Sequence, residues 1–580
     1  MSSLSSARVV ALHRLRNRFD GVAAAEKTTC LQACAERQLT NPRVVRRYHE
    51  TLLFMAAYPA NRGQASRVDA ELTRVTAATP ALFRSRVGAK ILKESGLAGE
   101  AVEGSFSIAM IEWLLTRFPG QIELAWLKGT AGADLDDLLS LALLPPERDG
   151  RLHTRFDMQR WLRFAVGADS TEERDLRWVL DRIRELVPDP ELRDLIAECL
   201  DLRVRWRLTA AGPTRTGIRF PPRPAFMQRG PLKRTFDVAR LLRRPLPEPV
   251  RLTPSAAGAL IDVARGVLAV RGREADPVTY ANPREVTLFR LERGIDIGLF
   301  GLEPRRRLPM ESYFGYVAAR NRVPLAYGGA WVLDRRAEIG VHLFDTFRGG
   351  ESAFLFGQVL RTYVHHYRIG RLQVDPYQFG ANNPEAIRSG AFWFYYRFGF
   401  RPRDAALREQ AAEEWASIRR DRAHRTPAAV LRRFTRSPLV LDVDRGSEAI
   451  THPDPTRVGV ALTETIRTRF GADRRAARRW AIRRVARLLP VDRRTRWTEA
   501  ERFAFDRLCP VIAALPDLDG WPNADRRALV TVMRSKGGIR ERDHVFGHQR
   551  HTRLRVALAE LEASVDWDRV PARPRWRPDD

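Results

Sequence analysis

The 580-residue sequence predicts an α/β protein with a mixed central sheet, crossed by helices and flanked by mostly helical regions. Strand-like segments follow one another closely between residues 286 and 344. A helical segment, a short strand and a second helix follow up to residue 397, an order typical of a mixed sheet with a crossover. Apolar residues before and after this region recur with a period near 3.6, which indicates helices.

The composition and the prolines divide the chain into four predicted parts. Hydrophobic residues make up 44% of the sequence, enough for several buried cores. Between residues 209 and 254, nine prolines remove backbone donors, so we expect an extended connector that lies along a neighbouring domain. The predicted parts are a helical N-terminal region (1–208), a Pro/Arg-rich connector (209–251), an α/β domain (252–404) and a basic, Arg-rich helical C-terminal region (405–580).

Within the α/β domain the elements are expected in a fixed order. A helix begins after Pro254, and a helix of about 17 residues follows the last long strand. The expected strands are Val286 to Leu291, Ile295 to Leu299, Tyr313 to Ala319, Val323 to Val332, Glu338 to Phe344 and Leu372 to Val374. The helix after the last strand is rich in aromatic residues and ends before Gly399.

The strand from Glu338 to Phe344 and the turn after it carry the strongest chemical signal. Glu338 and His342 share one face of this strand, because side chains alternate along it. Gly349 and Gly350 then precede a helix, whose first amides and partial positive charge suit a phosphate. A tight turn without a ligand is the alternative that this pattern leaves open.

The block from Tyr313 to Phe400 resembles the GNAT N-acetyltransferase superfamily. The order of strands and helices agrees, and Arg348 and Ala353 match the ends of the family's phosphate-binding turn. Glu351 stands where the family has its inner glycine, so we expect the turn to be re-registered, with the Glu351 side chain turned away. A second match, Ala-x3-Tyr-x3-Gly-Phe, begins at Ala391 and has Asn383 upstream.

This resemblance implies an N-acyltransferase that uses acetyl-CoA or another acyl-CoA as its cosubstrate. An unidentified amine would attack the thioester directly, so no covalent enzyme intermediate is needed. Tyr395 is the implied acid for the departing thiolate, and Glu338 and His342 are candidate bases. The implied coenzyme-binding residues are Arg348, Gly349, Gly350, Glu351, Ser352, Ala353 and Asn383.

The net charge of +29 indicates an attraction to polyanions. Arginines concentrate from Arg467 to Arg496 on an amphipathic helix, which is either a solvated face or a surface for nucleic acid or an acidic protein. The alternative function is therefore a non-catalytic GNAT-like scaffold that binds such a partner through these helices.

The remaining patterns bear on location and metals. No secretory signal or membrane-spanning run is recognised, and the four cysteines are scattered, so a cytoplasmic protein without membrane association is expected. His544, His548 and His551 have helical spacing, but no metal site is expected because arginines crowd them.

Overall fold

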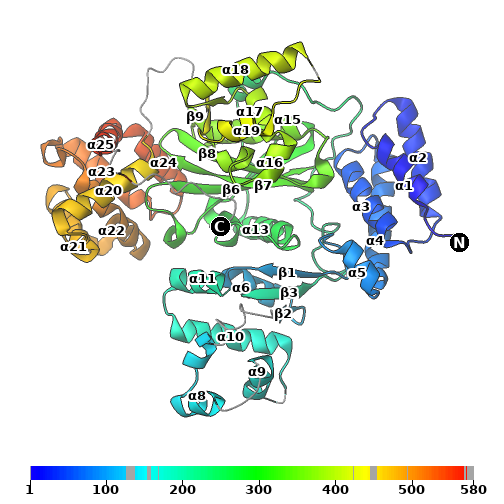
Figure 1. Cartoon of the computed structure of the whole chain (residues 1–580), viewed down its shortest axis with the longest axis horizontal. Helices are drawn as coiled ribbons and strands as arrows, with labels where there is room; N and C mark the ends of the chain where they lie inside the picture. Colours follow the sequence, from blue (N-terminus) through cyan, green and yellow to red (C-terminus); the bar gives the residue numbers. More distant parts are fainter. Residues whose placement is uncertain are drawn as a thin grey trace.

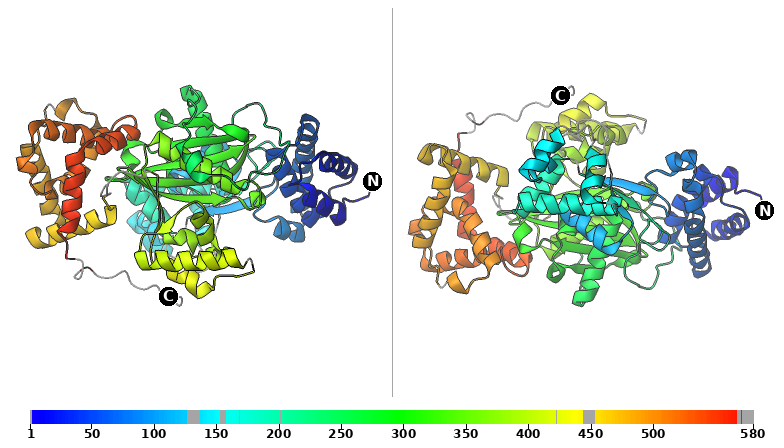
Figure 2. Two further views of the ribbon diagram at one scale, coloured as in Figure 1. Left: turned by 90° about the horizontal axis from the view of Figure 1, so that it is seen from above. Right: turned by 90° about the horizontal axis from the view of Figure 1, so that it is seen from below.

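The computed structural model describes residues 2–125, 137–152, 158–167, 169–200, 202–421, 423–443, 453–492, 494–566 and 570. A sheet with helices on both faces forms the middle of the molecule, and a small unit that contains α6, α8–α11 and β1–β3 lies beneath it (Figure 1). Helices α1–α5 and α20–α25 lie at opposite ends of the longest axis, as the views from above and below agree (Figure 2). The prediction of a mixed α/β protein is confirmed.

Eight strands form the central sheet, in the order β10-β11-β9-β8-β7-β6-β5-β4. Neighbours from β4 to β8 are antiparallel, β8 and β9 are parallel, and β11 pairs antiparallel with both β9 and β10. The strands are β4 (Thr287–Arg290), β5 (Ile295–Gly301), β6 (Ser312–Arg320), β7 (Val323–Leu333), β8 (Arg336–Leu343), β9 (Arg371–Val374), β10 (Arg401–Pro402) and β11 (Leu439–Asp442). The expected strands correspond to β4–β9.

The hairpin between β6 and β7 joins three regions of the chain. Its two turn residues, Asn321 and Arg322, have φ of 46° and 69°, the left-handed conformation of a tight two-residue hairpin. The Asn321 side chain accepts a hydrogen bond from the amide of Phe226 (2.8 Å) and donates one to the carbonyl of Ala57 (2.9 Å). The hairpin tip is thereby fixed to the connector and to α3 (Pro42–Ala57).

Helices cover both faces of the sheet. Helix α13 (Pro254–Ala269) lies below it, and α15 (Ser352–His366) and α17 (Ala391–Arg397) lie above it (Figure 1). Helix α15 is buried continuously from Phe354 to Val364, and the ring of Phe356 packs against those of Tyr395 and Phe398 on α17. Each such aromatic ring contributes about 1.5–3 kcal/mol by its burial.

The N-terminal region contains a small sheet as well as the expected helices. Strand β3 (Arg203–Arg207) lies between β1 (Ala101–Ser105) and β2 (Ile122–Leu124), and all pairs are antiparallel. The alternation in β3, with Val204 and Trp206 buried, is typical of a strand. Several helices separate β3 from β1 and β2 in the sequence, so local periodicity does not predict this sheet. The expectation that residues 1–208 are helical was therefore incomplete.

The connector lies along the central domain, as expected. The amide of Phe220 bonds to the carbonyl of Arg322, and that of Val250 bonds to the carbonyl of Leu288 at the sheet edge (both 2.8 Å). One short helix, α12 (Val238–Arg243), interrupts the extended path and packs against α15.

The boundary expected at residue 404 cuts through the sheet domain and is corrected here. Beyond it, α18 (Ala405–Arg420) and α19 (Ala428–Phe434) lead to β11, where Leu439 pairs with Val374 of β9. Strand β11 has only four residues, and its partner strands lie far away in the sequence, so no local pattern predicts it.

The C-terminal helices then form a bundle with a core of its own. They are α20 (Pro455–Phe470), α21 (Arg474–Leu488), α22 (Glu499–Ala514), α23 (Asn523–Ser535), α24 (Glu541–Arg550) and α25 (Thr552–Ala563). None of the described helices combines the length and apolarity needed to cross a bilayer.

Candidate functional site

The parallel strands β8 and β9 pair only at their beginnings. Their register joins three residue pairs, the last being Glu338 with Gln373, while β8 continues to Leu343 with its other edge on β7. The two strands therefore part at their carboxyl ends, where loops follow both of them. This fork separates the predicted turn after β8 from the segment after β9.

The glycine-rich turn after β8 provides fewer donors than the motif suggests. The amide of Arg348 bonds to Asp345 (3.1 Å) and that of Gly350 to Phe347 (3.0 Å), both at backbone carbonyls. Within the described residues, no hydrogen bond occupies the amides of Gly349, Ser352 and Ala353. The amide of Glu351 donates to the hydroxyl of Tyr58, so the predicted six-residue cradle is reduced to these three free donors.

Glu351 is a buried structural carboxylate. Its side chain is 1% exposed and accepts hydrogen bonds from Arg293 and from the buried Arg320, and from the amide of Lys233 (2.7 Å). Its own amide donates to the hydroxyl of Tyr58 (3.0 Å). Burial opposes the charged form, but the two arginines outweigh it and hold the pKa of Glu351 below its usual range.

Tyr58 brings the N-terminal region onto this turn. Its hydroxyl lies so close to Gly350 that a Cβ there would meet it at 2.8 Å. Packing against Tyr58 therefore requires a glycine at position 350. This contact explains the residue without a bound phosphate. Nothing in the local sequence indicated this contact, because Tyr58 lies 293 residues before Glu351.

Tyr395 is on α17, and its ring lies among aromatic side chains, including Phe356 of α15. It is 3% exposed and packs edge-on against Phe356, Phe394 and Phe400. Burial raises its pKa, so the phenol stays protonated at neutral pH. The described residues provide no hydrogen-bond partner for its hydroxyl, which leaves it able to donate.

Glu338 and His342 share a face of β8 but do not act as one group, because four residues of strand separate them by about 13 Å. Glu338 is at the fork, where it accepts hydrogen bonds from Gln373 (2.7 Å) and Arg336 (3.2 Å), and burial raises its pKa. The ring of His342 packs against that of Tyr327 (5.1 Å between centroids). Burial first, and then nearby arginines, lower the pKa of His342 to about 4.

Arg348 and Asn383 have structural partners. Arg348 pairs with Asp345 (2.9 Å) and with Glu385 (3.2 Å) of α16 (Pro384–Ser389), and so bridges the two loops of the fork. Asn383 caps α16, accepting from the amide of Ala386, and its amide group donates to the carbonyl of Tyr377. Both polar ends of Asn383 are occupied, so the structure gives it a capping role in place of the implied coenzyme contact.

Two residues that sequence reasoning missed lie at the fork. The hydroxyl of Tyr316 donates to the carbonyl of Gly340 (3.2 Å), and the Gln378 side chain lies beside Gly340, 3.3 Å from the position of a Cβ. That carbonyl would also be 2.3 Å from a Cβ on Gly328. A glycine at 328 in the strand was the available signal, because strand glycines mark close backbone approaches.

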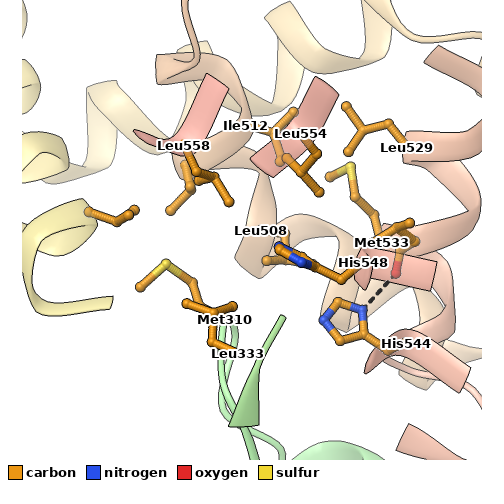
Figure 3. Close-up of a pocket in the computed structure, with 13 residues that line it drawn as sticks. Met310, Leu333, Leu508, Ile512, Leu529, Met533, His544, His548, Leu554 and Leu558 are labelled. Carbon is orange, nitrogen blue, oxygen red and sulfur yellow. Dashed lines mark hydrogen bonds between the residues drawn. The ribbon is translucent and has the colours of Figure 1, made fainter. Parts of the chain in front are cut away.

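The three spaced histidines border a small apolar cavity or cap a helix. His544 and His548 line a space of about 30 Å³ that is closed by Met310 and Leu333 of the central domain and by leucines and Met533 of the bundle (Figure 3). Nδ1 of His544 lies 2.9 Å from the carbonyl of Val532, and His551 accepts from the amide of Leu554. Across the described residues, no group of three or more metal-binding side chains comes together.

Comparisons with protein-family models, with curated proteins and with solved structures found nothing that matches this chain. The resemblance to N-acetyltransferases therefore rests on the sequence motifs alone.

Proposed function

We propose that this protein is an acyl-CoA-dependent N-acyltransferase. The observation that carries the proposal is the fork between β8 and β9, which opens next to the unbonded amides of Gly349, Ser352 and Ala353. These donors stand at the positive end of α15, which favours a diphosphate. The free edge of β8 can pair with an extended amide-containing arm, as a sheet edge pairs with a peptide.

The proposed reaction uses groups on both sides of the fork. The acceptor nitrogen attacks the thioester carbon, forming the C–N bond, and the C–S bond then breaks and releases the thiolate. Tyr395 gives its proton to the thiolate, and Glu338 takes the proton from the attacking amine. Glu338 is the preferred base because it lies at the fork and its raised pKa makes it more basic than an ordinary carboxylate.

His342 is the weaker candidate base. With a pKa near 4 it is unprotonated at neutral pH but has little affinity for a proton. Arg273 donates to the neighbouring Tyr327 hydroxyl (3.2 Å), and Arg271 lies over the ring of Phe344 (3.7 Å). Because these cations lie around His342, we assign it to the binding of an acidic part of the acceptor and not to proton transfer.

Binding of CoA and acetyl-CoA to the full-length protein tests the proposal. A functional site stabilises the fold by RT ln(1 + [L]/Kd), about 2.7 kcal/mol at a hundredfold excess over Kd. Ser352→Asp places a negative charge where it favours the helix but repels a diphosphate, so we expect at least tenfold weaker binding at undiminished stability. Ser352→Ala is the matched control and retains affinity. Absence of stabilisation of the wild-type protein by either compound would refute the proposal.

A scaffold that binds a polyanion is the second candidate, and the exposed face of α21 favours it. Seven exposed arginines on α21 and just beyond it have no carboxylate partner within the described residues. They are Arg474, Arg475, Arg478, Arg479, Arg483, Arg487 and Arg496. Binding of single- and double-stranded nucleic acid over a salt series tests this candidate, which requires a steep negative slope of log K against log salt. Binding of polyglutamate without nucleic acid would instead indicate an acidic protein partner.

A further inference from the structure

We propose that a groove between the edge of the sheet and the C-terminal bundle binds a phosphorylated small molecule of nucleotide size. The groove, here called the arginine groove, has a volume of about 760 Å³, within the range of small-molecule sites. Its walls come from the end of the connector, the segment before β4, the end of α15 and the start of α24. Sites of this kind form preferentially between domains.

Four arginines line the groove with little to neutralise them. Within the described residues, the guanidinium groups of Arg251, Arg284 and Arg540 have no hydrogen-bonding or ion-pairing partner. Arg542 lies 3.2 Å from the ring of His366. A guanidinium offers paired donors that match phosphate oxygens, so uncompensated arginines in one concave site favour a phosphate ligand.

The carboxylate in the lining, Glu285, is already engaged. It accepts a hydrogen bond from Arg307 (3.2 Å) and one from the amide of Arg542 (2.8 Å). Burial raises its pKa, and whatever negative charge it carries is paired with the guanidinium of Arg307 and is not free to offset the four arginines. The groove therefore presents a net positive charge to a ligand.

The walls of the groove are fixed before any ligand arrives. Arg307 is 2% exposed and donates to the carbonyls of Lys536 and Gly538, while the Asn282 side chain donates to that of Ile539 (2.8 Å). These bonds hold the segment before α24 against the sheet. A site whose backbone is already ordered loses less conformational entropy on binding.

Apolar surface beside the arginines favours a nucleotide over inorganic phosphate. Ile539 is 59% exposed in the groove, and Leu252 and Val286 line it as well. A ligand with an aromatic base can cover this surface while its phosphates contact the guanidinium groups.

The arginine groove is separate from the fork. It includes His366 at the last turn of α15, whereas the proposed diphosphate donors, from Gly349 to Ala353, lie at the first turn and just before it. A 15-residue helix is about 22 Å long, so one small ligand does not reach both places.

Calorimetric titration of the full-length protein with ADP, adenosine and inorganic phosphate tests the inference. We expect ADP to bind at least tenfold more weakly to the variant Arg251→Gln/Arg284→Gln/Arg540→Gln. The matched control Arg478→Gln/Arg479→Gln/Arg483→Gln removes the same charge from α21 and should change the affinity less than twofold. Adenosine and phosphate, which each lack half of the contacts, should bind more weakly than ADP.

A further control separates this site from the fork, because ADP is also part of CoA. Ser352→Asp should leave ADP binding at the arginine groove unchanged while weakening CoA binding at the fork. Absence of ADP binding to the wild-type protein would overturn the inference. Equal losses in the groove variant and the α21 control, or loss of ADP binding in Ser352→Asp, would overturn it as well.

Discussion

Replacement of Glu351 by glutamine should destabilise the central domain strongly. The carboxylate and the Arg320 guanidinium are both 1% exposed, and Arg293 and the amide of Lys233 complete the cluster. Glutamine retains the size of the side chain but removes the charge. After the substitution, Arg320 has lost its counter-ion. It retains only neutral partners, namely the new amide and Gln228 Oε1 at 2.6 Å.

The magnitude follows from this geometry. Removing one partner of a buried ion pair costs about 3–5 kcal/mol, because the remaining charge stays buried and unpaired. This is a large part of the 5–15 kcal/mol by which domains are typically stable. An exposed pair is worth about 0–1 kcal/mol, so Glu385→Gln, which breaks the exposed pair with Arg348, is the control.

Urea unfolding of the full-length protein, followed by tryptophan fluorescence and circular dichroism, measures both variants. A cycle that adds Arg320→Gln should show a coupling of at least about 1.5 kcal/mol with Glu351→Gln, since the two groups are in contact. A loss below about 1 kcal/mol in Glu351→Gln, or no difference from Glu385→Gln, would refute the assignment of Glu351 as a structural counter-ion.

Three further outcomes are expected. Tyr395→Phe should lower thiol release from acetyl-CoA by at least about 10²-fold in the presence of an amine acceptor and leave CoA affinity within twofold. His342, with its pKa lowered to about 4 in the fold, is uncharged in both the folded and the unfolded state above its ordinary pKa of 6.5, and it destabilises the fold as the pH falls from 6.5 toward 4, because the unfolded chain binds the proton more tightly. Urea unfolding at pH 7 and pH 5 should therefore show that the wild type loses about 1 kcal/mol more than His342→Asn, after allowance for the ring's partial exposure. Gly537→Ala should cost about 1–3 kcal/mol, since its Cβ would lie 2.2 Å from the carbonyl oxygen of Ala500, whereas Gly459→Ala, in open space within α20, should add about 0.5–1 kcal/mol.

The strands of the central meander could be predicted because their signals are local. Alternation and turn residues mark β4 to β8, and the tight Asn321-Arg322 turn fixes the hairpin between β6 and β7. The sheet of the N-terminal region and β11 could not be predicted, since each depends on partners far away in the chain.

The sequence predicted where the candidate site lies, but not which of its hydrogen-bonding groups are already occupied. Local sequence indicated the turn after β8, yet the contact that occupies the Glu351 amide comes from Tyr58 in the N-terminal region. Arg320, at the end of a buried strand, was the available hint of a buried carboxylate, because a charge there needs a partner.

The place of β11 has a consequence for how the protein is made. This strand lies between β9 and β10 in space, yet the ribosome synthesises it last of the sheet strands, because it begins at Leu439, 37 residues after Pro402 ends β10. Until it emerges, β9 has only its three residue pairs with β8, and its outer edge is bare. The nascent chain therefore exposes an open edge on which another growing polypeptide could pair, and a fragment truncated at residue 404 would retain that hazard permanently.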